Sequence, residues 1–351
     1  MTENRSRPDA AAVDRSEAYS DLALEAMPTQ RPYPGVAVEE AEARGCHVTR
    51  VYVENEVGAR QMGKPPGTYI TIEADALRQS SRTAQEEISA AFAQELCGLL
   101  PAGPDEPVLI VGLGNWNATP DALGPRVVND ILITRHLYDQ VPQEKRGGLR
   151  PVAALAPGVL GLTGIETGEI IRGVIDRVRP AFVIAIDALA SRSVHRIGTT
   201  VQLTNTGIHP GSGVGNKRIG ITIETLGVPV LAIGVPTVVH AQTIARDVID
   251  TLTERLGGDQ TAQGLAALAP EEKSRLIDEV LLPTVGDLMV TPKEIDLLIN
   301  DVSRVVAGGL NAVAPLVEQG IPIESKALSG LVDYADLFSH DVLASKLSAL
   351  K

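Results

Sequence analysis

PVLIVGLGN, at residues 107–115, is an apolar run that ends in glycines. A run without alternating polar residues is typical of a strand buried on both faces of a parallel sheet. A second such run, PAFVIAIDALA at residues 180–190, follows a helical pattern at residues 166–179. Strands that alternate with helices predict an α/β fold with a mostly parallel sheet and helices on both of its faces.

Further elements extend this pattern in both directions along the chain. Towards the N-terminus, two strand-like segments at residues 47–56 and 67–74 are joined by the Gly/Pro-rich connection GARQMGKPPG. These segments predict an additional, smaller β-containing subregion. The other predicted elements are strands at 151–157, 198–203, 220–225 and 228–236, helices at 84–100 and 121–140, a helix from about residue 240, and C-terminal helices, one of which is predicted to start at the capping box Thr291–Glu294.

Composition excludes several classes of function. The 351 residues include 31 Lys plus Arg and 44 Asp plus Glu, a net charge of −13, and only 3% are aromatic. The acidic excess argues against nucleic acid and anionic membranes as partners, and the few aromatics argue against base stacking. The longest apolar run, 228–239, is interrupted by Pro229, Gly234 and Pro236, so we expect no membrane span. Since no apolar signal core precedes these elements, we expect a cytosolic location.

Cysteine and histidine usage predicts neither a disulfide framework nor a metal site. Cys46 and Cys97 show no CxxC or Cys/His ligand spacing, and we expect both thiols to be buried as small hydrophobic groups. We interpret His195, His209 and His240 as hydrogen-bonding loop residues rather than metal ligands. The sequence therefore predicts no metal and no cofactor.

The common nucleotide and hydrolase motifs are absent. GLGNWN at residues 112–117 has Asn117 where a dinucleotide fingerprint needs its third glycine. The glycine loop GSGVGNKR has an asparagine before its lysine, so it is not a Walker A loop. Two positions before Ser212 stands Pro210, where the GxSxG motif of a nucleophile elbow needs glycine. The zinc-protease motif HExxH does not occur in the sequence.

Two carboxylates remain in positions where α/β folds place function. Asp187 follows the apolar strand FVIAI, and Asp121 follows the loop GLGNWNATP. If their strands are neighbours, both side chains project into the crevice at the carboxyl ends of the strands. Two carboxyls in a partly dry crevice share one proton, so that one serves as an acid while the other activates water. This chemistry hydrolyses amides, although the pattern alone leaves helix capping open for Asp121 and loop capping open for Asp187.

Long ordered motifs carry a resemblance to a known family. The stretches VGLGNWNATPDALGPRVV, LAPGVLGLTGIETGEII, IAIDALASRSVHRIGTTVQLTNTGIHPGSGVGN and LGVPVLAIGVPTVV, together with MVTPKEID, closely resemble the germination protease of spore-forming bacteria. The resemblance runs from about Asp21 to the C-terminal helices. It implies an endopeptidase of the forespore or spore core that is made as a zymogen, degrades small acid-soluble spore proteins and assembles as a homotetramer.

The resemblance also implies roles for particular residues. The family's two proposed catalytic aspartates fall on Asp121 and Asp187, which implies an atypical aspartic mechanism. The core fold is expected to be similar to that of hydrogenase maturation proteases, with a phosphorylase-like core. In hydrogenase maturation proteases the two equivalent carboxylates help bind a metal, and a histidine completes that site. The resemblance does not identify a matching histidine in this sequence. A metal-dependent maturation-type endopeptidase that uses the same carboxylates is therefore the alternative.

A processing site is implied near the N-terminus. The family cleaves after Glu or Asp and before a hydrophobic residue followed by Ala, which matches a cut between Asp21 and Leu22. Residues 1–21 are then a propeptide-like extension and residues 22–351 a single α/β peptidase domain with C-terminal helices. One departure is Ala18, which stands where the family prefers an acid; Glu17 lies one place off.

An acidic residue before the cut needs a local cation in a protein with this net charge. The candidates that follow the strands are Arg192, Arg196, Lys217 and Arg218. A hypothesis from another class is a non-catalytic binding module that uses the glycine loop for an anionic ligand.

Overall fold

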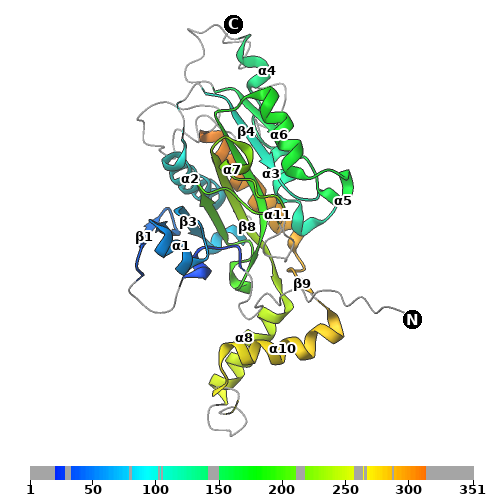
Figure 1. Ribbon diagram of the computed structural model, residues 1–351. Helices are drawn as coiled ribbons and strands as arrows, with labels where there is room; N and C mark the ends of the chain where they lie inside the picture. Colours follow the sequence, from blue (N-terminus) through cyan, green and yellow to red (C-terminus); the bar gives the residue numbers. More distant parts are fainter. Residues whose placement is uncertain are drawn as a thin grey trace, which may run out of the picture.

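The computed structural model describes residues 20–27, 33–78, 81–101, 103, 106–140, 150–210, 218–256, 264, 267–286 and 288–313. Within these residues, one nine-stranded sheet is packed between helices (Figure 1). The predictions that concern residues 1–19, Lys217 and the segment after Val313 lie outside the described residues.

The sheet is mixed, whereas the sequence predicted a mostly parallel one. Its strands, in spatial order, are β1 (Val36–Ala43), β2 (Cys46–Val53), β3 (Gly67–Glu73), β7 (Thr200–Thr204), β8 (Val230–His240), β6 (Phe182–Ser191), β4 (Val108–Gly112) and β5 (Val152–Leu155), and β9 (Met289–Val290) pairs with β8. The pairs of β8 with β6, β6 with β4 and β4 with β5 are parallel, and the other pairs are antiparallel. Short connections such as the turn at Arg44 and Gly45 cannot join parallel strands, which need a long crossover.

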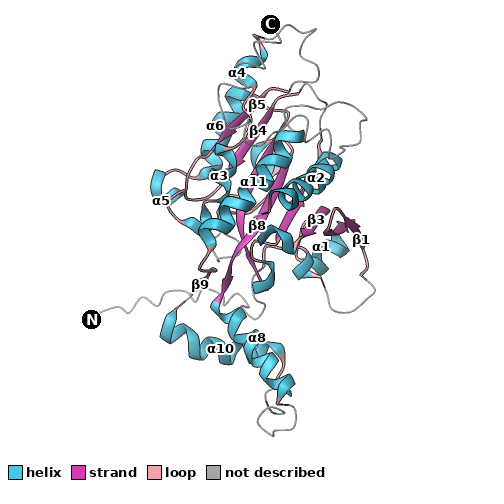
Figure 2. Cartoon of the chain, turned by 180° about the vertical axis from the view of Figure 1, so that it is seen from behind, coloured by secondary structure: helices cyan, strands magenta, loops and turns pink. Residues whose placement is uncertain are grey.

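The predicted coverage of both sheet faces is confirmed by the packing of β4. Val108 and Ile110 belong to a core cluster that includes side chains of α2 (Arg82–Leu99), α3 (Leu123–Asn129) and α11 (Ile295–Val313). Leu109 and Val111 alternate with them and pack with α6 (Thr167–Val178) and α7 (Ile223–Leu226). Figure 2 shows α2, α3 and α11 on one side of the sheet, whereas α6 and α7 lie on the side seen in Figure 1. Strand β4 is therefore buried from both sides.

The smaller β subregion continues the same sheet. Strands β1 to β3 form an antiparallel extension whose own small cluster includes Val51, Val53, Met62 and Tyr69. The remaining elements are α1 (Glu56–Met62), α4 (Arg135–Tyr138), α5 (Leu160–Thr163), α8 (Ala241–Arg255), α10 (Pro270–Val285) and the 3-10 turns η1 (Leu24–Ala26), η2 (Asp75–Arg78), η3 (Thr119–Asp121) and η5 (Val194–Arg196). Helices α8 and α10 pack on each other and project from the far end of β8 (Figure 1). No helix in the described part of the chain is both long and apolar enough to cross a bilayer.

Several local predictions were wrong. The predicted strand at 220–225 is a single bridge from Ile221 to Ile208, followed at once by α7. The predicted helix at 121–140 is broken between α3 and α4. Cys46 is buried as expected, but Cys97 is exposed. Helix α11 begins at Ile295, past the predicted capping box, because the Thr291 hydroxyl donates to the Thr237 carbonyl instead of capping the helix.

Candidate active site

Asp187 lies inside β6 rather than at its end. The strand continues to Ser191, but its neighbour β4 stops at Gly112, which pairs with Ile186. Asp187 is therefore the first residue of β6 beyond the end of β4, and its pairing partner in β8 is Gly234. Asp187 is only 6% exposed, and its carboxylate accepts a hydrogen bond from the N–H of Ala188 at 3.0 Å. A carboxyl group is thus buried at the carboxyl end of β4, where β6 continues without that neighbour.

Asp121 is held by the loop that follows β4. The chain turns at Gly114, whose φ is +114°, and a Cβ there would lie 2.0 Å from the carbonyl oxygen of Asp121. The N–H of Asn115 then donates to the Asp121 carbonyl at 3.1 Å and to its carboxylate at 2.8 Å. A side chain cannot fit at such a contact, so glycine at 114 lets the loop close on Asp121. The second glycine of Gly112-Leu113-Gly114 is thus explained by this close contact, and no bound dinucleotide is needed to account for it.

Asp121 and Asp187 line the same cavity, which has a volume of about 400 Å³. Arg218, His209 and Asp21 also contribute to its wall. The two aspartates were predicted to share one crevice, and the structure brings both to this cavity. They come from opposite sides of the β4–β6 boundary, one from the strand and one from the loop.

Burial dominates the electrostatics of this pair. It raises the pKa of Asp121, while the N–H of Asn115 and the charge of Arg218 oppose the shift. Burial raises the pKa of Asp187 well above its ordinary value, and the negative charges of Asp121 and Asp21 raise it further. Carboxyls in such surroundings cannot both ionise readily, so Asp187 is the member that keeps a proton more strongly.

Asp21 is docked beside the pair. Its N–H donates to the carbonyl of Ala190 at 3.1 Å, and the N–H of Ala190 donates to its carboxylate at 2.9 Å. Its carbonyl oxygen accepts from Lys64 Nζ at 3.0 Å and from Gln202 Nε2 at 3.3 Å. Asp21, the residue before the cut that the resemblance implies, therefore lies at the cavity, and its carbonyl oxygen is hydrogen-bonded to two side chains.

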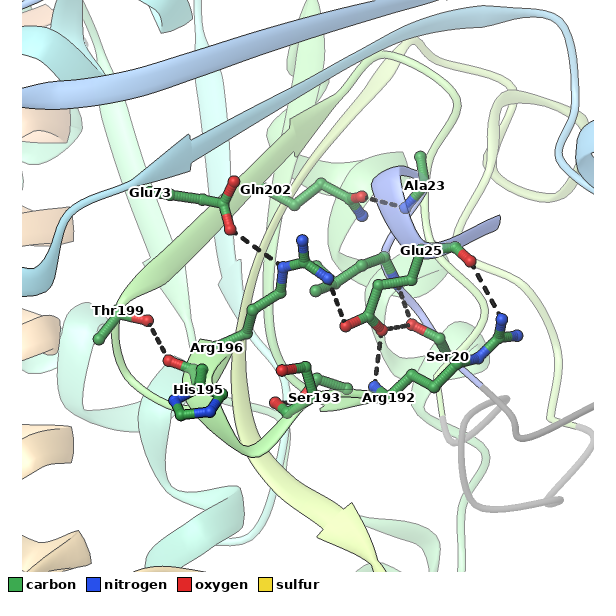
Figure 3. Close-up of polar contacts among 12 residues, drawn as sticks. Ser20, Ala23, Glu25, Glu73, Arg192, Ser193, His195, Arg196, Thr199 and Gln202 are labelled. Atoms are coloured by element: carbon green, nitrogen blue, oxygen red, sulfur yellow. Dashed lines mark hydrogen bonds and ion pairs between the residues drawn. The ribbon is translucent and has the colours of Figure 1, made fainter. Parts of the chain in front are cut away.

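The residues after Asp21 are buried in the body of the protein. Leu22 and Ala23 are fully buried, and Ala23 packs with the cluster below β1 to β3. The N–H of Ala23 donates to Gln202 Oε1 at 2.6 Å (Figure 3). Small and apolar side chains therefore fit the two positions after Asp21.

Two of the predicted cations, Arg192 and Arg196, contact Glu25. Arg196 Nη1 lies 2.8 Å from the Glu25 carboxylate, and its Nε lies 3.0 Å from Glu73 (Figure 3). Arg192 contacts Glu25 twice, since its backbone N–H donates to the carboxylate at 2.6 Å and its Nη1 to the carbonyl at 3.2 Å. The Ser20 hydroxyl also donates to Glu25. Arg218 is the candidate that lines the cavity with the aspartates, and Lys217 lies outside the described residues.

Sequence reasoning missed three residues that the structure places here, namely Lys64, Gln202 and Glu25. Lys64 stands in the Gly/Pro-rich connection before β3. Gln202 lies in β7, and it is buried. Its position between Val201 and Leu203 in a predicted strand is a signal that could have marked it, because a buried polar group needs hydrogen-bond partners. A lysine in a connecting loop and a glutamate after the cut carry no comparable signal.

The described residues do not fit a metal ion. No group of three or more His, Cys, Asp or Glu side chains in the described part of the chain is arranged to hold one. Arg218 lines the cavity with the two aspartates, and its positive charge acts to lower the pKa of both.

Comparison with known proteins identifies the family. The chain matches the family model described as germination protease over residues 12–266 and 259–321. It is 51% identical over 299 residues to the germination protease of Caldanaerobacter subterraneus subsp. tengcongensis, which covers 83% of this chain and 92% of that protein. Against the germination protease of Clostridium acetobutylicum the identity is 45% over 313 residues, with 85% and 96% covered. Against that of Priestia megaterium it is 44% over 342 residues, with 86% and 92% covered.

A solved structure of the [NiFe] hydrogenase maturation protease HycI from Thermococcus kodakarensis is 18% identical, covers 53% of this chain and 98% of its own, and has a TM-score of 0.27. That score carries no argument, so the expected similarity of the core remains a prediction. The family match and the relatives cover most of the chain, and they agree in name. This chain therefore belongs to the germination protease family, and it is a germination endopeptidase.

Proposed function

We propose that the chain is a zymogen that hydrolyses peptide bonds with Asp121 and Asp187 as an atypical aspartic pair, and that it removes residues 1–21 by cutting between Asp21 and Leu22. The observation that carries the proposal is that Asp21, Asp121 and Asp187 line one cavity. The residue before the proposed cut thus lies at the same cavity as the two carboxyls that would serve as general acid and general base.

The chemistry assigns a different task to each aspartate. Asp187, whose pKa is raised more strongly, holds the proton, and Asp121 is ionised. Asp121 takes a proton from water while the water oxygen bonds to the carbonyl carbon and the π pair moves onto the carbonyl oxygen. That pair then re-forms the carbonyl, the C–N bond breaks, and Asp187 gives its proton to the leaving nitrogen. The products are a carboxyl group and an amino group, and the pair again holds one proton.

We assign small acid-soluble spore proteins as substrates, with cleavage after Glu or Asp and before a hydrophobic residue. The contacts of residues 21–23 support this specificity. The Ala190 N–H binds the acidic side chain before the cut, and Leu22 and Ala23 occupy fully buried positions after it. A backbone donor can therefore recognise the acid in a protein whose net charge is −13. Arg192 and Arg196 act on a second acid, at Glu25.

The cellular setting follows from the family resemblance. We propose a homotetramer that acts in the forespore or spore core on spore proteins, without nucleic acid or membrane as partners. Neither a metal nor a cofactor enters the proposed steps.

The experiment compares wild type with Asp121→Asn and Asp187→Asn. Intact mass is followed over time for loss of residues 1–21, and digestion of a small acid-soluble spore protein is followed by electrophoresis. Both variants should be folded by circular dichroism and inactive in both assays. Asp139→Asn, at an exposed aspartate, is the matched control and should remain active.

Three outcomes would contradict the proposal. A folded variant of either aspartate that cleaves at the wild-type rate excludes the pair. Loss of wild-type activity in a chelator, restored by a divalent metal, would favour the metal-dependent alternative. A wild-type chain that never cuts itself or any spore protein would favour the binding module.

A further inference from the structure

The carbonyl oxygen of Asp21 accepts two hydrogen bonds from side chains. Lys64 Nζ donates to it at 3.0 Å and Gln202 Nε2 at 3.3 Å. Under the proposed cut between Asp21 and Leu22, this is the carbonyl oxygen of the peptide group whose C–N bond breaks. It is therefore the atom on which negative charge develops when water adds to the carbonyl carbon.

Gln202 bonds to the chain on both sides of Leu22. Its Nε2 donates to the Asp21 carbonyl, and its Oε1 accepts from the N–H of Ala23 at 2.6 Å. In the sheet, Gln202 and Asp187 both pair with Gly234, so one strand separates them and their side chains leave the same face. Gln202 thus connects the peptide that is to be cut with the row of the sheet that holds Asp187.

Lys64 is fixed by its neighbours along the chain. Gly63 ends α1 in the left-handed conformation with φ +60°, and the hydroxyl of Tyr69 donates to the carbonyl of Pro65 at 2.8 Å. The pKa of Lys64 is lowered, mainly because the ammonium group is buried. The negative charges of Asp21 and Glu25 oppose this shift, and the positive charge of Arg192 adds to it. A partly desolvated ammonium on a carbonyl oxygen stabilises negative charge more strongly than the same group in water.

We propose that Lys64 and Gln202 form the oxyanion site of this enzyme, in which their N–H groups bind the carbonyl oxygen of the residue before the cut and stabilise the charge that it gains. The inference rests on the proposed cut between Asp21 and Leu22. With this oxygen bound by two donors, the proton on Asp187 is reserved for the leaving nitrogen of Leu22. Lys64 and Gln202 contact the reacting atoms, so both are catalytic residues.

A simpler role for the same contacts is to anchor the segment in its ground state. The two roles differ in what they change. An anchor stabilises the docked segment and the transition state equally, whereas an oxyanion site stabilises mainly the transition state. Docking and the rate of cleavage must therefore be measured separately on the full-length chain.

The rate of self-cleavage is measured by intact mass for wild type, Lys64→Met, Lys64→Arg and Gln202→Glu. Removal of one oxyanion donor lowers the rate of such enzymes about 10²–10³-fold, which is the loss expected for Lys64→Met. Lys64→Arg keeps a charged donor and should recover most of that loss. Gln202→Glu keeps the acceptor for Ala23, loses the donor and adds a negative charge, so it should cleave at least as slowly as Lys64→Met. Lys273→Met, which removes a lysine of α10 paired with Asp250, is the matched control and should cleave normally.

Docking is measured by hydrogen exchange of the Asp21 and Ala23 amides in an Asp187→Asn background. We expect Lys64→Met and Gln202→Glu to change the protection of these amides less than about 3-fold, since catalysis rather than binding is lost. If protection falls by the same factor as the rate of cleavage, Lys64 is an anchor and the inference is overturned. It is also overturned if Lys64→Met cleaves at the wild-type rate while Asp187→Asn is inactive. Normal cleavage by Asp187→Asn, or a cut at another bond, instead refutes the proposed function. If Lys64→Met does not fold, Gln202→Glu decides.

Discussion

Asp21 and Ala190 bond to each other twice, once through the backbone N–H of Asp21 and once through its carboxylate. Ala190 lies on β6, the strand that also carries Asp187. The acidic residue before the proposed cut is therefore fixed relative to the aspartate that holds the proton. Asp21 thus contacts β6 through both its main chain and its side chain. In peptide recognition, main-chain contacts give affinity and side-chain contacts give specificity.

The carboxylate of Asp21 should set the rate of self-cleavage. Asp21→Ala removes the acceptor for the Ala190 N–H, and a hydrogen bond to a charged group contributes about 1.5–3 kcal/mol. We expect loss of residues 1–21 to slow by about 10- to 100-fold, measured by intact mass over time. Asp139→Ala, at an exposed site on the chain after α4, is the control and should cleave normally. An Asp21→Ala chain that cleaves within about twofold of wild type would show that the carboxylate is not recognised.

Glu25 should hold the docked segment through Arg196. The Glu25 side chain is 3% exposed and that of Arg196 is 25% exposed, so the pair is partly screened by solvent. We expect Glu25→Gln and Arg196→Met each to increase hydrogen exchange at residues 20–27 in an Asp187→Asn background. Because the two residues are in contact, the double variant should lose less than the sum, with a coupling energy of about 1–2 kcal/mol. Glu86→Gln, which weakens the exposed pair with Arg82, is the control and should leave this exchange unchanged. Strictly additive effects would argue against the pair.

The buried Asp187 should make stability depend on pH. Its pKa is higher in the folded than in the unfolded chain, so between those two values the folded state binds more protons. The free energy of unfolding therefore falls as the pH rises through this window, by up to about 1.4 kcal/mol per pH unit. Asparagine cannot ionise, so Asp187→Asn should raise the Tm at pH of about 7 and have little effect at pH of about 3, below the ordinary pKa of aspartate.

This comparison is made in an Asp121→Asn background, in which neither chain is expected to cut itself. Thermal unfolding is followed by circular dichroism at several pH values. Burial is the largest cause of the Asp187 shift, so the direction persists without the charge of Asp121. A lower Tm for the Asp187→Asn chain at neutral pH would show that the carboxylate is stabilised in the fold.

Gly114 should be required for activity because it lets the loop close on Asp121. In Gly114→Ala, the added Cβ would meet the Asp121 carbonyl at 2.0 Å, so the loop must move. We expect cleavage to fall by at least about 100-fold, since misplacement of a catalytic group by about 1 Å has such an effect. Gly45→Ala is the matched control. Its φ is +73° but nothing lies within 4 Å, so it should lose about 1–2 kcal/mol of stability and keep its activity.

Much of the fold was predictable from local pattern. The apolar runs at 107–115 and 180–190 became β4 and β6, since a strand covered on both faces needs apolar side chains on both. The helical period at 84–100 became α2. The pattern failed at 220–225, where a strand was predicted but the structure has a single bridge and a short helix. A short run with few apolar residues does not distinguish these structures. The pattern also failed on strand direction, because periodicity does not say which strands pair.

The sequence by itself indicated that Asp121 and Asp187 reach one crevice, because the ends of neighbouring parallel strands lie at the same edge of the sheet, and both residues line one cavity. It also determined the family, through long ordered motifs that the matched relatives share. Only the tertiary structure decided which residues meet the Asp21 carbonyl. Lys64 precedes β3 and Gln202 lies in β7, and these strands come together with β8 and β6 only through the spatial order of the sheet. A hydrogen bond between residues so far apart in the chain depends on that order and register, which local periodicity does not encode.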